Sequence, residues 1–289
     1  MKKYILYTAA LMAITISSCR KIETDGEIQV VVVNGGGGGT PTAQTITLQG
    51  RINADTVLRK ANSYILKGIV YMVGNHTMTI EPGTVIKGAF SGTDVAALVI
   101  TRGSKIIAAG TATDPIVFTS LSPNPQSGDW GGIVLCGKAG YNLSYNGTAG
   151  LYQVEGGIDN ANGDGLAGSG DAVAPSPVPN DNSGVLQYVR IEYAGYAFQP
   201  DKEINSLTMA AVGSGTTIDH IQVTYAKDDA YEWFGGSVNC KFLIAYKTQD
   251  DDFDTDNGYN GKVQFGLVMR DSLIADISTS EAFESDNNA

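Results

Sequence analysis

Five aspartates occupy the seven positions from residue 250 to residue 256. A run this dense can hold a hard cation, form an acidic turn or remain a solvated patch. The EF-hand calcium loop is excluded, because counting from Asp252 as position 1 places Asn257 where that loop needs glycine and Val263 where it needs glutamate. The carboxylates therefore have to be judged as a different kind of site.

Two other segments repeat the same order of residue types. Residues 228–236 (DDAYEWFGG) align with residues 250–258 (DDDFDTDNG) at a shift of 22 positions, and EAFE at 281–284 repeats the order acid, any residue, aromatic, acid a further 30 positions on. The first shift pairs Asp229 with Asp251, Tyr231 with Phe253 and Glu232 with Asp254. Recurrence at one point of a repeat indicates equivalent places in a repeating fold.

A column of stacked carboxylates predicts a metal site. Two carboxylates about 5 Å apart repel by roughly 3 kcal/mol at an effective dielectric constant of about 20, so a shielded column needs a cation or raised pKa values. Calcium is the candidate cofactor, because it takes about six to eight oxygen ligands. The predicted ligands are Asp229, Glu232, Asp251, Asp252, Asp254 and Asp256. The alternative is that these side chains accept backbone hydrogen bonds at turns and otherwise face water.

Two tryptophans are candidate ligand-binding residues. Trp130 lies in GDWGG, and Trp233 lies two residues after Tyr231. If exposed, their rings could stack on sugar rings, a use that suits tryptophan. The alternative is structural, since Tyr231, Phe253 and Phe283 coincide in the repeats and would form a ladder of rings along the fold.

The elements that position these residues are short strands. Runs of β-branched and aromatic residues recur between clusters of glycine, asparagine and aspartate, and no amphipathic helix follows the N-terminal leader. Residues 187–195 (QYVRIEYAG) align with residues 219–227 (DHIQVTYAK) at a shift of 32 positions. A repeat of about 20 to 30 residues built from alternating strands predicts a parallel β-helix, in which equivalent residues of successive rungs stack about 4.8 Å apart. A β-sandwich gives no reason for the acidic signature to recur.

The N-terminal residues predict export and lipidation. Lys2 and Lys3 precede an apolar run at residues 4–16, which is a secretory signal and too short for a membrane span. The ending ISSC resembles a bacterial lipobox, which makes Cys19 the predicted lipidation site. The several acyl chains of a bacterial lipoprotein would anchor the chain stably in a membrane.

Three segments follow from these features. Residues 1–18 are the predicted lipoprotein signal peptide, residues 19–45 the acylated cysteine with a flexible glycine-rich tether, and residues 46–289 the β-helix domain. An insert at about residues 141–183, rich in Gly, Asn, Asp and Pro, breaks the repeat and is expected to protrude near a ligand groove. The domain is expected to be incomplete at its C-terminus, because residue 289 falls within the third acidic segment.

Composition limits the partners. The formal net charge is −11, and removing the two lysines of the leader makes it −13, which argues against nucleic acid as a partner. His76 and His220 are the only histidines, so a histidine metal cluster or a Ser-His-Asp triad is poorly supplied. Cys136 and Cys240 are the cysteines left after Cys19, and they allow one disulfide at most.

Several longer motifs carry a family resemblance. They are TIEPGTVIKG, GTATDPIVFTS, GDWGGIVLCGKA, TTIDHIQVTYAKDDAYEWFGG and DDDFDTDNGYNGKVQFG. From about residue 66 to its end the chain resembles uncharacterised surface lipoproteins of Bacteroidota with a pectate-lyase-like domain. The resemblance implies a right-handed parallel β-helix, which makes the predicted class all-β, and a location on the cell surface at the outer membrane.

Two functions follow from the site and the resemblance. The first is a non-enzymatic binding or scaffold module for a polysaccharide or for an outer-membrane protein partner. The alternative is a calcium-dependent polysaccharide lyase or glycoside hydrolase at the acidic edge, with Arg190, Lys247 or Arg270 as the base of a lyase, or Asp228-Asp229 and Asp250-Asp251 as the acids of a hydrolase. The Arg-x-Pro-x-x-Arg pattern of pectate lyases and the His-Gly pattern of polygalacturonases are both absent from the sequence.

Overall fold

The computed structural model describes residues 31–32, 43–199, 202–277 and 279–287. The predicted signal peptide, the lipidation site Cys19 and most of the tether lie outside these ranges. Among the described residues no helix has the length and apolar character needed to cross a membrane. The one helical element within the described ranges is the 3-10 turn η1 (Gly92–Asp94).

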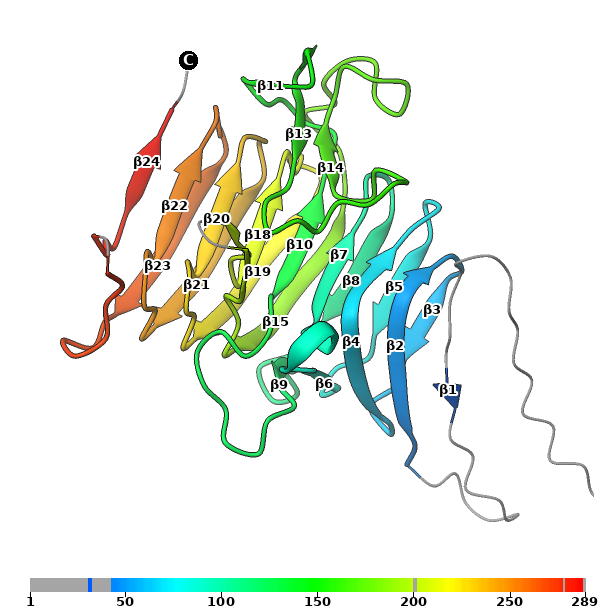
Figure 1. Ribbon diagram of the computed structural model, residues 1–289, viewed down its shortest axis with the longest axis vertical. Coiled ribbons are helices and arrows are strands. Elements are labelled where there is room, and N and C mark those ends of the chain that lie inside the picture. Colours follow the sequence, from blue (N-terminus) through cyan, green and yellow to red (C-terminus); the bar gives the residue numbers. More distant parts are fainter. Residues whose placement is uncertain (1–30, 33–42, 200–201, 278, 288–289) are drawn as a thin grey trace, which may run out of the picture.

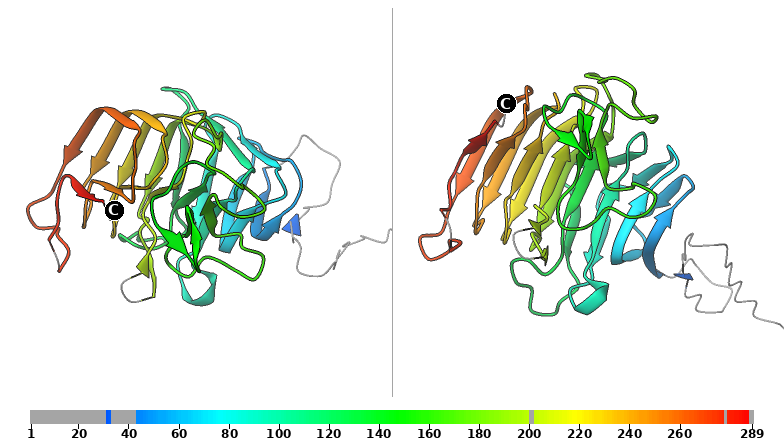
Figure 2. Two further views of the ribbon diagram at one scale, coloured as in Figure 1. Left: turned by 90° about the horizontal axis from the view of Figure 1, so that it is seen from above. Right: turned by 45° about the horizontal axis from the view of Figure 1, so that its top comes forward.

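The described chain coils into a parallel β-helix, which confirms the predicted all-β class. One 18-stranded sheet forms the wall of the coil, and its strands follow one another side by side from blue β2 to red β24 in Figure 1. All pairings within it are parallel except that of β1 (Val31–Val32) with β2 (Thr45–Ile52). Figure 2 shows the same stack of strands from two further directions.

The strands form three faces, each named here by its order along a turn of the coil. The first face has β3 (Thr56–Leu58), β5 (Thr77–Ile80) and β8 (Lys105–Ala109); the second has β6 (Val85–Gly88) and β9 (Ile116–Ser120). The third face has β7 (Ala97–Ile100), β10 (Ile133–Cys136), β18 (Leu207–Ala210), β20 (Tyr231–Phe234), β22 (Phe253–Asp256) and β24 (Glu284–Asp286).

Longer strands bend from one face to the next. β2 and β4 (Ser63–Met72) pass from the second face to the third. Four others pass from the first face to the second: β15 (Gly184–Glu192), β19 (Thr217–Thr224), β21 (Asn239–Tyr246) and β23 (Lys262–Met269). One residue with a left-handed backbone makes each of these four bends: Tyr188 (φ 47°), His220 (φ 53°), Phe242 (φ 54°) and Phe265 (φ 65°).

The register of the strands confirms the repeats seen in the sequence. The 32-residue shift appears as Val189 beside Ile221 and Ile191 beside Val223. The 22-residue shift appears as Tyr231 beside Phe253 and Glu232 beside Asp254, and the 30-residue shift as Asp254 beside Glu284. Side chains of one repeat position therefore stack as columns along the coil, as a solenoid requires.

The interior of the coil is filled by large apolar side chains. Trp130, Trp233 and Tyr231 have no exposed surface. The Tyr231 hydroxyl lies 2.9 Å from both the Ile221 and the Ile244 carbonyl, which share its one proton as acceptors. The two tryptophans could stack on a ligand only if their rings were exposed, and both rings are buried. Cys136 and Cys240 are buried and free, so the disulfide that the composition allows is not formed.

The insert covers part of the third face from outside. It carries the short pairs β11 (Ser144–Tyr145) with β12 (Thr148–Ala149) and β13 (Leu151–Gln153) with β14 (Leu166–Gly168), drawn in green beside β10 in Figures 1 and 2. Its residues Tyr152, Val154 and Ile158 form a second apolar core with outward side chains such as Val134 and Phe234.

Ion pairs join the insert to the coil. Arg51 pairs with Asp164 at 2.8 Å, Arg102 with Asp171 at 2.7 Å and Lys138 with Asp181 at 3.3 Å. The insert is therefore a packed cover of the third face. The remaining strands are the hairpin β16 (Ala197–Gln199) and β17 (Lys202–Glu203), which lies between β15 and β18.

Candidate metal centre

The acidic repeats meet on the third face of the coil. β20, β22 and β24 lie side by side there, and the turns that lead into them carry Asp228-Asp229, Asp250-Asp251 and Glu281. Residues alternate between the two sides of a strand, so the inward positions hold Tyr231, Trp233 and Phe253 while Glu232 and Asp254 point outward. The predicted carboxylate column is thus an outer feature of an aromatic core.

Asp229 and Asp251 act first as turn residues. The Asp229 Oδ1 accepts a hydrogen bond of 2.9 Å from the backbone N–H of Asp251. The Asp251 Oδ1 in turn accepts from the backbone N–H of Glu281. Each carboxylate therefore satisfies the donor at the same point of the next rung, which supports the structural alternative for these two residues.

Glu232 and Asp254 have no such backbone role, and with Asp229 they form the centre of the site. Carboxylate oxygens of these three residues all lie within 4.8 Å of one another. Asp229 is 8% exposed and Glu232 is 7% exposed. We call these three residues the carboxylate triad. Three negative charges at this separation and burial cannot persist without protons or a cation.

Polar atoms around the triad lack partners. The Asn205 side-chain N–H donates to the Glu232 Oε2, but its Oδ1 has no hydrogen-bond partner among the described residues. The same holds for the Thr208 Oγ1 and the Asp254 Oδ1. Thr208 lies beside Glu232 in the register of β18 and β20, so its side chain is on the same outer side. Buried oxygens without donors fit a cation better than they fit a closed protein interior.

Burial raises the pKa values of the triad. It lifts the pKa of Glu232 well above its ordinary value, and the charges of Asp229 and Asp254 raise it further. Burial and then Asp228 raise the pKa of Asp229. For Asp254, burial and then Asp256 raise the pKa to about 6. The carboxyls thus bind protons near neutral pH, and a cation that binds there displaces those protons.

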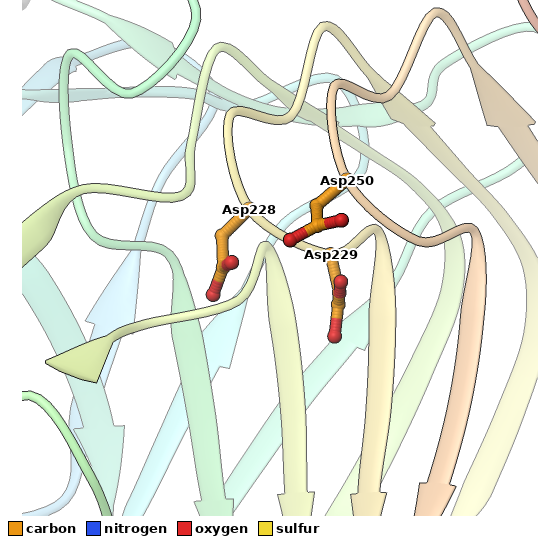
Figure 3. Close-up of side chains that lie close together, drawn as sticks. All are labelled: Asp228, Asp229 and Asp250. Atoms are coloured by element: carbon orange, nitrogen blue, oxygen red, sulfur yellow. The ribbon is translucent and has the colours of Figure 1, made fainter. Parts of the chain in front are cut away.

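A second cluster shares Asp229 with the triad. Carboxylate oxygens of Asp228, Asp229 and Asp250 also lie within 4.8 Å of one another, and Figure 3 shows the three side chains at the turns above β20 and β22. Burial, followed by the charge of Asp251, raises the pKa of Asp250 to about 6. This cluster is more open, because Asp228 and Asp250 are only partly buried.

Not every predicted ligand joins these clusters. The Asp252 Oδ2 is 2.8 Å from the Arg270 guanidinium, and the Asp256 Oδ2 accepts a hydrogen bond of 2.9 Å from the Asn257 side chain. Asp251 is committed to the backbone of Glu281. The triad therefore contains Asp229, Glu232 and Asp254 out of the six predicted ligands.

Four neighbours of the triad were not predicted as ligands. Asp228 and Asp250 adjoin predicted ligands in the sequence, so their proximity was visible in the repeats. Asn205 and Thr208 were missed because they are neutral residues at the positions where the later rungs carry Asp229 and Glu232. The register of Leu207 with Tyr231 corresponds to a shift of 24 positions, and that shift would have aligned Asn205 with Asp229 and Thr208 with Glu232.

The residues present fit a hard divalent cation. The triad supplies three carboxylates, and Asn205 and Thr208 supply neutral oxygens at its border. Oxygen-only surroundings of this kind suit calcium and lack the nitrogen and sulfur ligands that zinc prefers.

Comparison with known proteins identifies the domain. A family model described as a pectate-lyase like beta helix domain matches residues 50–289. Neither the proteins with curated descriptions nor the solved structures include a match to the chain. The matched range contains the coil from the last residues of β2 onward, the insert and the acidic edge.

Proposed function

We propose that this chain, which belongs to the family of pectate-lyase-like β-helix domains, is a calcium-dependent, non-enzymatic glycan-binding module. The fold fits a role related to carbohydrates. The observation that carries the proposal is the triad, in which carboxylates of Asp229, Glu232 and Asp254 approach within 4.8 Å while two of them are more than nine-tenths buried.

The chain's own residues have distinct parts in this proposal. Asp229, Glu232 and Asp254 hold the cation, and Asn205 orients Glu232 by its hydrogen bond. The more open carboxylates Asp228 and Asp250 lie next to the triad, where solvent and a ligand can reach them. A bound calcium ion would supply a positive charge at this edge and would accept hydroxyl or carboxylate oxygens of a glycan.

The position of the basic residues favours binding over a lyase reaction. Arg270 is engaged with Asp252 and with the Glu281 carbonyl, and Lys247 pairs with Asp271 at 2.9 Å. Arg190 projects from the second face of the coil, away from β20 and β22. Within the described part of the chain, none of the three candidate bases forms a hydrogen bond or ion pair with the triad, so a sugar held there would lack a base for proton removal.

A glycoside hydrolase is the second candidate. The specific observation in its favour is that the pKa values of Asp250 and Asp254 are both raised to about 6, close to the range of a general acid at neutral pH. A hydrolase needs one protonated and one ionised carboxyl on opposite sides of a glycosidic bond. The acidic edge offers the residues for such a pair.

We extend the proposal to the location of the protein. Acylation of Cys19 would tether the domain to the outer membrane through residues 20–45, and the domain would face the cell exterior and bind a polysaccharide or an outer-membrane protein. Labelling of growing cells with a radioactive fatty acid should mark the wild-type protein and leave Cys19→Ala unlabelled. Protease treatment of intact cells should then degrade the wild-type domain.

Calcium binding is tested on the purified domain by thermal unfolding. Calcium at about 100 times its dissociation constant should stabilise the fold by about 2.7 kcal/mol, which raises the melting temperature by several degrees. Glu232→Gln and Asp254→Asn should abolish most of this rise while increasing the stability without calcium, because each removes a repelling charge. Asp94→Asn, at a distant exposed acid, is the matched control.

The glycan and the absence of turnover are tested together. Glycan-array binding that depends on calcium and is lost in Glu232→Gln would support the module. The same polysaccharides are then assayed for unsaturated products by absorbance and for new reducing ends. Turnover that disappears in Asp254→Asn or Asp250→Asn would establish the enzyme instead, and a wild-type domain whose melting temperature ignores millimolar calcium would remove the site.

A further inference from the structure

A groove opens on the second face of the coil, on strands other than those of the triad. It has a volume of about 380 Å³ and runs across β15, β19, β21 and β23. Its wall consists of the four residues that bend these strands, and Ala112 and Pro115 of the loop between β8 and β9 lie on its border. This volume is in the range of small-molecule sites, which begins at about 300 Å³.

The wall of the groove is a ladder of aromatic rings. The ring of His220 stacks 4.4 Å from Tyr188 on one side and 4.4 Å from Phe242 on the other, and Phe265 follows at 4.8 Å. We call these four residues the aromatic ladder. Because the rings stack face to face on one another, they present mainly edges to the groove. Stacking of sugar rings needs free aromatic faces, so this wall is poorly suited to a glycan.

The floor changes from polar to apolar along the coil. Its outward side chains are in register: Arg190 lies beside Gln222, Gln222 beside Ile244, and Ile244 beside Leu267. Three rung spacings separate the first from the last, which amounts to roughly 14 Å. Leu267 is 50% exposed and Phe265 is 58% exposed, so the apolar end is open to an occupant.

Arg190 is the charged group of the groove. It is exposed, and within the described part of the chain it forms no hydrogen bond or ion pair. Glu192 lies two residues further along the same strand and makes no ion pair with it. The Gln222 side chain donates to Thr224 at 3.1 Å, and His220 is paired with Asp219. A free guanidinium in a chain of net charge −11 selects an anion at this end of the groove.

We propose that this groove binds an amphipathic carboxylate with one linear alkyl chain. The carboxylate lies against the Arg190 guanidinium, and the chain follows the floor over Ile244 to Leu267 beside the ring edges of Phe242 and Phe265. The charge and the apolar strip lie at opposite ends of the same register column, which matches a molecule polar at one end only. The site is separate from the triad and independent of calcium.

Dodecanoate is the probe, used below its micelle concentration with the purified domain in isothermal titration calorimetry. One molecule should bind per chain, and butanoate should bind at least tenfold more weakly because it leaves the apolar floor uncovered. Dodecan-1-ol and the dodecyltrimethylammonium cation should also bind at least tenfold more weakly, since neither can form a charge-assisted bidentate pair with Arg190.

Paired variants locate the site. Arg190→Gln and Leu267→Ser should each weaken dodecanoate binding about tenfold, and both positions are exposed, so the melting temperature should change little. The matched controls are Lys87→Gln and Val85→Ser on β6, which are exposed on the same face but outside the groove. They should leave binding unchanged.

Three results would overturn the proposal. Equal affinity for dodecanoate and dodecan-1-ol would mean that Arg190 selects nothing. Glycan binding lost in Arg190→Gln, together with no dodecanoate binding, would assign the groove to sugars. A dimer in solution that Leu267→Ser dissociates, again without dodecanoate binding, would assign it to a second copy of the chain. Since none of these readouts requires calcium, failure here is distinguishable from failure of the triad.

Discussion

Two columns of side chains run along the same coil with opposite energetics. On the third face the carboxylates of Glu232, Asp254 and Glu284 follow one another in register, and at the bend between the first and second faces the aromatic ladder does the same. Stacked rings attract each other, whereas stacked carboxylates repel. In a solenoid, an attraction or repulsion between equivalent side chains of two neighbouring rungs is repeated at every further rung that carries the same residue type.

The aromatic ladder therefore stabilises the fold, whereas the carboxylate column destabilises it and is better explained by a function. Ring stacking in the aromatic ladder offsets the backbone strain of four non-glycine residues at positive φ. In the carboxylate column, Glu232 accepts a hydrogen bond from Asn205, but the stacking of the carboxylates on one another stabilises nothing. Carboxylates that destabilise the folded chain are expected at a site where a bound ligand offsets their repulsion.

Tyr231 links the two columns through the interior, and its removal should have the largest effect. It follows the acidic turn at the start of β20, stacks on Phe253 at 5.5 Å and donates to the Ile244 carbonyl beneath the groove. Tyr231→Ala should reduce the free energy of unfolding by about 3–5 kcal/mol, measured by urea denaturation. Tyr231→Phe should cost about 1–3 kcal/mol, because the hydrogen bond of the buried hydroxyl is lost.

This comparison also tests whether the columns are coupled. If they are, Tyr231→Phe should weaken both calcium binding at the triad and dodecanoate binding in the groove. Unchanged binding at both sites would mean that the interior transmits nothing between the faces, although the loss of stability would remain.

The next largest effect should be a pH dependence of stability that comes from the carboxylate column and not from the aromatic ladder. Raised pKa values favour the protonated acids in the folded chain, so their contribution to stability is complete below the unfolded values near 4 and is lost as pH rises through about 6 for Asp250 and Asp254. Hydrogen bonding to Asp251 and burial raise the pKa of Glu284 to about 8, which extends the loss. In a chelator the melting temperature should fall by a few degrees between pH 5 and pH 8, and calcium should restore it.

The acidic edge can be isolated from the other titrating groups by a variant. Asp254→Asn should flatten this fall, while Phe242→Leu in the aromatic ladder should leave its slope unaltered. A melting temperature that rises steadily from pH 5 to pH 8 in the chelator would contradict the raised pKa values and with them the electrostatic cost of the column.

The aromatic ladder should show the smallest effects. Phe242→Ala removes a ring that stacks on both neighbours and should cost about 0.5–1.5 kcal/mol by chemical denaturation, at any pH and calcium concentration. Phe242→Asn should cost less, because asparagine tolerates the left-handed backbone of this position (φ 54°). Equal losses in the two variants would show that backbone strain is negligible at the bend.

Much of the coil could be predicted because its information is local and repeated. Equivalent residues 22, 30 and 32 positions apart were readable as neighbours, and the pairing of Glu232 with Asp254 and of Val189 with Ile221 confirms them. The rung of Asn205 and Thr208 escaped because it shares position but not residue type with the acidic rungs. A search for repeats in the sequence finds only those rungs that keep the same residue types at equivalent positions.

The sequence by itself determined which residues stack, since a strand's alternation and the repeat length decide register. Only the tertiary structure decided which of them are buried. Phe234 projects from the outer side of β20, and its burial depends on Tyr152 and Val154 of an insert that precedes β20 by about 80 residues along the chain. The inward turn of Trp233 follows likewise from the closure of three faces around one core, because burial is a property of what the rest of the chain places over a residue.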